Sequence, residues 1–136
     1  MDTNKYRPAC SAKAADGAIR GTLIGVIWGG FFAPVAAASG APLPGAAARV
    51  LSAGGSAVRH GLGFASFLAV FNGITCCAEQ LRGGDRDALN HFVGGAAAGA
   101  MISVRVRNPL HIAAVSLGTG CVTAGISILR GPGDAG

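Results

Sequence analysis

Charged residues divide the chain into long stretches that contain no Asp, Glu, Lys or Arg. The four longest are 21–48, 60–78, 88–104 and 108–129. A helix needs roughly 17–25 apolar residues to cross a bilayer, because the hydrocarbon core is about 30 Å thick and each residue adds about 1.5 Å. None of the four stretches has a polar face that could meet water. Each is therefore expected to form one membrane-spanning helix.

Turn-forming residues set the expected ends of these helices. The first stretch is longer than one span, and its three prolines between positions 34 and 44 indicate a loop. Asn108 and Pro109 favour a turn followed by a helix start. The sequence thus predicts an all-α membrane protein, with both termini on the same side. Its helices are expected at about 17–38, 56–78, 88–104 and 109–129, between a polar tail at 1–16 and a short tail at 131–136.

Small residues recur at helical spacing in every expected helix. In lipid, helices associate through close van der Waals contact, so small residues mark the faces that meet. The pattern predicts a tight bundle packed through Gly/Ala stripes. The expected packing glycines are Gly17, Gly21, Gly25, Gly29, Gly61, Gly73 and Gly120.

Composition supports a membrane protein over a soluble one. The 136 residues are 51% hydrophobic and only 12% charged, and 23 of them are Gly. An ordinary soluble domain has about 25% charged residues, and disordered chains have low hydrophobicity. A buried Ala/Gly-rich bundle in water is the competing interpretation, but it would need polar outer faces. A small membrane protein fits the numbers better.

No catalytic motif is present. The chain has no complete dinucleotide or phosphate-binding glycine loop, no metalloprotease or nucleophile-elbow motif and no CxxC pair. His60, His91 and His111 are far apart in the sequence, and no expected span has an ionisable residue near its middle. We therefore expect no catalytic residues, no metal site, no cofactor and no small-molecule substrate. The chain is expected not to be an enzyme.

The net charge of +5 comes from basic residues near helix ends. Nucleic-acid binding would need them clustered on one soluble face, so no nucleic-acid partner is expected. Four of them share one side of the predicted membrane protein. They could contact the headgroups of a bound phospholipid such as cardiolipin, or serve only as orientation signals. These residues are Arg49, Arg59, Arg105 and Arg107.

Four cysteines leave the disulfide pairing open. Cys10 precedes the first expected helix, and Cys76 and Cys77 close the second, so all three lie on the same side. A disulfide between Cys10 and either Cys76 or Cys77 is geometrically possible if that side is oxidising. The alternative is that all four cysteines are small packing residues. Cys121 lies mid-span and is expected to be free.

The segment that leaves the second expected helix resembles a family signature. That signature has an aromatic residue, ten residues, Arg, three residues, Asp, six residues, a small residue followed by Gly, three residues and Gly. Through this segment the chain resembles the mitochondrial inner-membrane translocase channel family, also called the preprotein and amino-acid transporter family. The chain departs from it in placing four residues before the Asp. The matching residues are Phe71, Arg82, Asp87, Gly94, Gly95 and Gly99.

Within that family, the longer spacing is most similar to the small four-helix accessory subunit of respiratory complex I. The run at 87–90 and Arg105-x-Arg107 are similar as well. The resemblance implies a non-catalytic, multi-pass subunit of the mitochondrial inner membrane. It would stabilise the membrane arm of NADH:ubiquinone oxidoreductase, with membrane-arm subunits and the lipid bilayer as partners.

Two alternatives within the family remain open: a subunit of an inner-membrane preprotein translocase, and a plastid envelope channel. A translocase should carry several polar residues on one face of its first two helices. Only Thr22, Ser66, Asn72 and Thr75 meet that description in the expected helices. Asp87 is expected to cap the third helix, with Arg82 paired to it or to Asp85, which is a structural role.

Overall fold

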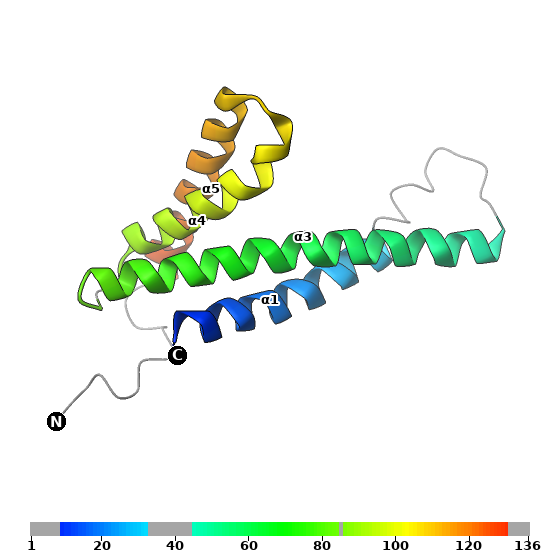
Figure 1. Cartoon of the computed structure of the whole chain (residues 1–136), viewed down its shortest axis with the longest axis horizontal. Coiled ribbons are helices and arrows are strands. Elements are labelled where there is room, and N and C mark those ends of the chain that lie inside the picture. The colour runs from blue at the N-terminus through cyan, green and yellow to red at the C-terminus, as the bar shows by residue number, and fades with distance from the viewer. Residues whose placement is uncertain (1–8, 33–44, 85, 131–136) are drawn as a thin grey trace.

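The computed structural model describes residues 9–32, 45–84 and 86–130, without the side chains of 46–49, and all regular structure in these ranges is helical. α3 forms the long axis, α1 runs antiparallel beside it, and the hairpin of α4 and α5 leans away from it (Figure 1). The predicted all-α fold is confirmed for this part of the chain. The elements are α1 (Cys10–Ile27), η2 (a π-helix, Trp28–Phe32), α3 (Ala46–Leu81), α4 (Ala88–Ser103), η3 (a 3-10 turn, Val104–Val106) and α5 (Pro109–Arg130).

The first two helices begin earlier than the sequence analysis predicted. α1 begins at Cys10 and α3 at Ala46, whereas the expected starts were 17 and 56. Both added segments are rich in Ala, the strongest helix former, so the helix continues past the edge of the uncharged stretch. The expected end of the first helix near residue 38 lies outside the described residues. So do residues 1–8 and 131–136 of the two tails.

Glycine ends α3. Gly83 and Gly84 have φ values of 79° and 98°, a left-handed conformation that residues with a Cβ atom adopt at a cost. The backbone N–H of Gly84 donates to the carbonyl of Glu79 at 2.7 Å. The helix therefore stops at Leu81, and the chain reverses within a few residues.

Asn108 starts α5. Its Oδ1 accepts hydrogen bonds from the backbone N–H groups of Leu110 at 3.1 Å and His111 at 3.4 Å. These are donors that the first turn of a helix leaves unpaired. This cap fixes the start of α5 at Pro109. Both α4 and α5 begin and end within one residue of the bounds that the sequence predicts.

Two helices of the described part are long and apolar enough to cross a membrane by length and composition, Val50–Leu81 and Pro109–Arg130. α4 has only 16 residues, and α1 carries three charged residues, Lys13, Asp16 and Arg20. Two of the four predicted spans are thus identified by this criterion.

Glycines bring the backbones of α1 and α3 into direct contact. A Cβ atom on any of three glycines of α1, or on Gly29 of η2, would overlap a backbone carbonyl of α3. Each step of four residues along α1 matches a step of four back along α3, so the two helices keep one antiparallel register. The pairs are Gly17 with Leu68, Gly21 with Phe64, Gly25 with His60, and Gly29 with Ser56. On the α3 side, Gly61 meets Val26 and Gly73 meets Ala14.

The hairpin of α4 and α5 uses the same device together with hydrogen bonds. A Cβ atom on Gly95 or Gly99 would lie 3.0 Å from the carbonyl of Thr119 or Val115, respectively. Gly120 of α5 lies against the ring and carbonyl of Phe92. Two side chains of α5 donate to backbone carbonyls of α4: Ser116 to Ala96 at 2.7 Å and Thr123 to His91 at 2.8 Å.

Replacing Gly21 by Ala should separate α1 from α3. The added methyl group would overlap the Phe64 carbonyl and come within 2.8 Å of the Ala65 Cα atom, both of which belong to a helix backbone. Overpacking of this kind costs about 1–3 kcal/mol. We expect a lower thermal denaturation midpoint for Gly21→Ala in mild detergent. Gly118→Ala is the control, because nothing lies within 4 Å of that position. Equal midpoints for the two variants would contradict the contact.

Candidate functional site: a polar cleft at the disulfide end

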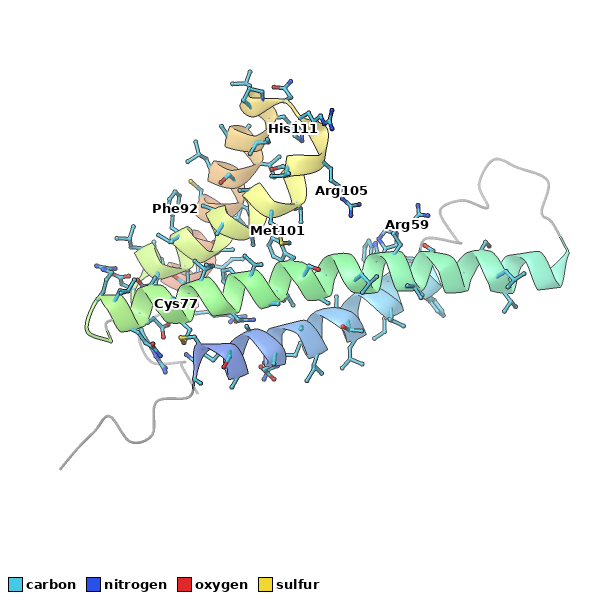
Figure 2. All side chains as sticks on the ribbon, viewed as in Figure 1. Arg59, Cys77, Phe92, Met101, Arg105 and His111 are labelled. Carbon is cyan, nitrogen blue, oxygen red and sulfur yellow. A yellow bond between two sulfur atoms is a disulfide. The ribbon has the colours of Figure 1, made fainter. Side chains whose placement is uncertain are left out.

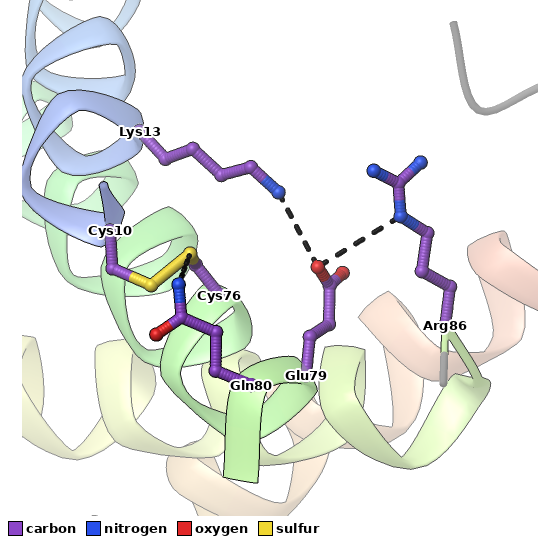
Figure 3. The surroundings of a disulfide bond; sticks show 6 residues. All are labelled: Cys10, Lys13, Cys76, Glu79, Gln80 and Arg86. Carbon is purple, nitrogen blue, oxygen red and sulfur yellow. Dashed lines mark hydrogen bonds and ion pairs between the residues drawn. A yellow bond between two sulfur atoms is a disulfide. The ribbon is translucent and has the colours of Figure 1, made fainter. Parts of the chain in front are cut away.

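A disulfide joins the first residue of α1 to α3. Cys10 is bonded to Cys76 with a Cα–Cα distance of 5.5 Å, whereas Cys77 and Cys121 are free and exposed. The Nε2 group of Gln80 lies 3.8 Å from the Cys76 sulfur (Figure 3). Cys76 pairs because it continues the four-residue row of α3 that faces α1, through 56, 60, 64, 68 and 72. Cys77 lies one position further round the helix, on its outer surface.

Beside the disulfide, three helices and a turn enclose a polar cleft of about 460 Å³. Its walls come from α1, α3, the turn after α3 and the start of α4. The lining residues are Lys13, Asp16, Arg20, Phe71, Asn72, Thr75, Cys76, Glu79, Arg86 and His91.

Glu79 is the electrostatic centre of the cleft. Its Oε2 atom lies 3.4 Å from Lys13 Nζ on α1 and 4.0 Å from Arg86 Nε in the turn (Figure 3). The Glu79 side chain is only 14% exposed, so these contacts are partly shielded from solvent. On α1, Arg20 pairs with Asp16 at 3.0 Å. Both signs of charge therefore lie in one cleft, and each cation has a carboxylate partner.

Uncharged polar groups lie deeper, on α3. Asn72 donates from Nδ2 to the carbonyl of Leu68 at 2.9 Å. Thr75 is buried, and its Oγ1 atom has no hydrogen-bond partner among the described residues. That hydroxyl lies against Gly94 of α4. An unpaired buried hydroxyl costs free energy.

The turn between α3 and α4 is closed by an ion pair. Arg82 Nη1 lies 2.7 Å from Oδ1 and 2.6 Å from Oδ2 of Asp87, and it also donates to Asn90 Oδ1 at 3.2 Å. Asp87 in turn caps α4, accepting from the Asn90 backbone N–H at 3.1 Å. The hydrogen bond from Arg82 lowers the pKa of Asp87, with a further contribution from the Asn90 N–H. Of the two partners considered for Arg82, Asp87 is the one observed; Asp85 is outside the described residues.

The remaining signature residues lie where helices meet. The carbonyl of Phe71 faces Gly94, and its ring lies 5.9 Å from that of His91. Gly94 thus faces α3, while Gly95 and Gly99 face α5. The signature is therefore a set of packing and turn residues next to the cleft.

The arginines expected near lipid headgroups lie away from the cleft. Arg59, Arg105 and Arg107 are exposed, and the first two are labelled in Figure 2 near the opening between α3 and the α4–α5 hairpin. The side chain of Arg49 is outside the described residues.

Sequence reasoning missed most of the charged lining of the cleft. Lys13 and Asp16 were assigned to a polar tail, and only uncharged residues were counted as a transport face. Thr22 and Ser66 do not line the cleft. Their hydroxyls donate to the carbonyls of Ala18 and Leu62 in their own helices. The spacing of Lys13, Asp16 and Arg20 (i, i+3, i+7) was the available signal for one helical face.

The described part is an all-helical protein with two helices of membrane-spanning length, close glycine contacts and a mixed-charge cleft. The chain belongs to the Tim17/Tim22/Tim23/Pmp24 family, which it matches over residues 10–126. It has no significant match among individual curated proteins. The family comprises mitochondrial inner-membrane translocase and channel proteins. Membership supports the translocase interpretation better than the complex I interpretation, for which the match gives no evidence.

The capping ion pair should make stability depend on pH in a defined direction. Because the pKa of Asp87 in the folded protein is lowered from 3.8, its stabilising effect is complete above that value and is lost as pH falls through the lowered pKa. Asp87→Asn keeps a good helix cap but removes the charge. We expect its thermal midpoint to be lower than the wild-type midpoint at pH 7, with the difference shrinking below about pH 3.8.

The control is Asp16→Asn, which removes an exposed carboxylate from an i,i+4 pair. It should change the midpoint less at pH 7, since exposed pairs contribute little. A gap between Asp87→Asn and wild type that is unchanged at low pH would contradict the role of the ionised carboxylate.

Proposed function

We propose that this chain is a translocase-type protein of the mitochondrial inner membrane, in which the polar cleft receives a polypeptide segment during its transfer into or across the bilayer. The observation that carries the proposal is the cleft itself. Polypeptides present backbone amides and side chains of both charges. A cleft with Lys13, Glu79 and Asn72 on its walls offers partners for each of them.

The connectivity supports four membrane crossings. Val50–Leu81 and Pro109–Arg130 each have the length and composition of a span. α3 ends at the disulfide end, and α5 begins at the tip of the α4–α5 hairpin and returns toward the disulfide end (Figure 1). α4 connects the end of α3 to the start of α5, so α4 and α5 run antiparallel along the hairpin. α1 lies antiparallel to α3 over a four-glycine contact and would accompany it through the bilayer.

The ion pairs in the cleft are suited to exchange. Lys13 and Arg86 share one carboxylate, at 3.4 and 4.0 Å, so either cation can leave while the other stays. A charged side chain of an entering segment could then replace one partner without leaving the Glu79 carboxylate, which is only 14% exposed, unpaired. The cleft therefore supports transient binding better than permanent occupation.

An accessory subunit of complex I is the second candidate. It is favoured by the four residues between Arg82 and Asp87, a spacing that Gly83 and Gly84 accommodate by their positive φ values. In that case the cleft would be covered by a neighbouring subunit, and its ion pairs would be static.

Photo-crosslinking in mitochondria can test the translocase proposal. Phe71 lines the cleft, so replacing it with p-benzoylphenylalanine keeps the phenyl ring and adds a photoreactive benzoyl group there. Phe32 in η2 is the matched control, since it is exposed and does not line the cleft. We expect crosslinks from position 71 to a precursor arrested during import, and none from position 32. Crosslinks at position 71 only to resident subunits would contradict the proposal.

Mild-detergent native electrophoresis with mass spectrometry separates the two candidates. Migration with other translocase components is the expected result. Co-migration with an NADH-oxidising band would replace the translocase proposal by the complex I candidate.

A further inference from the structure

The structure contains a second hollow, distant from the disulfide and different in chemistry. This cleft has a volume of about 320 Å³ and lies between α3 and the far part of α4. It is lined by Arg59, His60, Gly63, Phe64, Phe67 and Ile102. Figure 2 shows the opening between the two elements, with Arg59 on one side and Met101 and Arg105 on the other.

Divergence of the hairpin from α3 leaves this cleft open. α4 touches α3 closely near Gly94, where a Cβ atom would overlap the Thr75 hydroxyl. Further along, the two helices separate, and nothing lies within 4 Å of the Cβ position of Gly63. Phe64 is 38% exposed and Ile102 is 47% exposed. The walls are therefore apolar and unfilled, with a notch at Gly63.

Arg59 in the lining of the cleft and Arg105 across its opening place positive charge at the mouth (Figure 2). Lys13, Arg20, Arg82 and Arg86 at the disulfide end are each paired with a carboxylate. Arg59, Arg105 and Arg107 have no acidic partner among the described residues. Every described carboxylate, on Asp16, Glu79 and Asp87, belongs to the disulfide end and is already paired.

An apolar groove that ends at unpaired arginines fits an amphiphile with a hydrocarbon chain and an anionic head. We propose that this cleft binds one anionic phospholipid of the bilayer, with an acyl chain over Gly63, Phe64, Phe67 and Ile102 and its phosphate at Arg59 and Arg105. Arginine binds phosphate through two parallel hydrogen bonds, which favours it over a neutral polar group at this position. Arg105 lies one turn beyond Ile102, so both ends of one lipid can be reached from the same helix end.

Such a lipid would also fix the angle between α3 and the α4–α5 hairpin. It would do so by filling the space that glycine leaves between α3 and α4. The proposal rests on the membrane embedding of the proposed function. It does not depend on whether the chain handles precursors or braces complex I.

Lipid retention by the purified full-length chain tests the proposal. The protein would be exchanged into detergent, mixed with phosphatidylglycerol or phosphatidylcholine, and examined by native mass spectrometry for bound lipid. We expect one phosphatidylglycerol to be retained in preference to phosphatidylcholine. The double variant Arg59→Gln/Arg105→Gln should weaken phosphatidylglycerol binding about tenfold, and Gly63→Leu should lower retention of both lipids by filling the notch.

Arg20→Gln is the matched control, because it removes one positive charge at the disulfide end. It should retain the lipid as wild type does. Equal loss in Arg20→Gln and in the double variant, or no loss in the double variant, would overturn the proposal. Correct folding of each variant is checked by counting two maleimide-reactive thiols, Cys77 and Cys121, before reduction. Because the assay uses the isolated chain, its outcome is independent of the crosslinking that tests translocation.

Discussion

Direct backbone contact between α1 and α3 determines how the rest of the chain is arranged. Three glycines of α1 and Gly29 of η2 lie against backbone carbonyls of α3 at a constant four-residue step, and the Cys10–Cys76 disulfide joins the same two helices. Close approach brings Cα–H groups to carbonyl oxygens, contacts that are individually weak but repeat along the interface. The register also fixes the rotation of α1. Lys13 precedes Gly17 by one turn, so it lies beside Glu79 and contributes to the cleft.

Two neighbouring glycines of α4 pack against two different helices, α3 and α5. Gly94 faces α3 and Gly95 faces α5, so α4 touches both helices within a single turn. Hydrogen bonds from Ser116 and Thr123 hold α5 to α4 but not to α3. The hairpin is therefore free to lean away from α3. The described part thus carries a polar, charge-balanced cleft lined by α1, α3 and the start of α4, and a separate apolar cleft between α3 and the far part of α4.

Sequence alone predicted the second half of the fold better than the first. Asn108–Pro109 marks a helix boundary by local chemistry, so the start of α5 needed no tertiary information. The start of α1 did need tertiary information. In the sequence Lys13 belongs to a polar tail, and only the fold shows that it pairs with Glu79 of α3. The disulfide was narrowed only to Cys10 with Cys76 or Cys77, since both cysteines close the second predicted helix on the same side as Cys10. The observed contact row of α3 leads to Cys76, and that helix rotation is set by α1.

The contact between α1 and α3 creates a polar cleft that we expect water to reach when the chain is in a membrane. The most direct test is labelling of single cysteines in proteoliposomes with a membrane-impermeant maleimide, after Cys77 and Cys121 are replaced by Ala and with both membrane faces reachable. Asn72→Cys lies in the cleft, whereas Val122→Cys lies on the exposed outer surface of α5. We expect rapid labelling of the cysteine at position 72 and protection by lipid of the cysteine at position 122. Equal protection at both positions, with the Cys10–Cys76 disulfide intact, would contradict it.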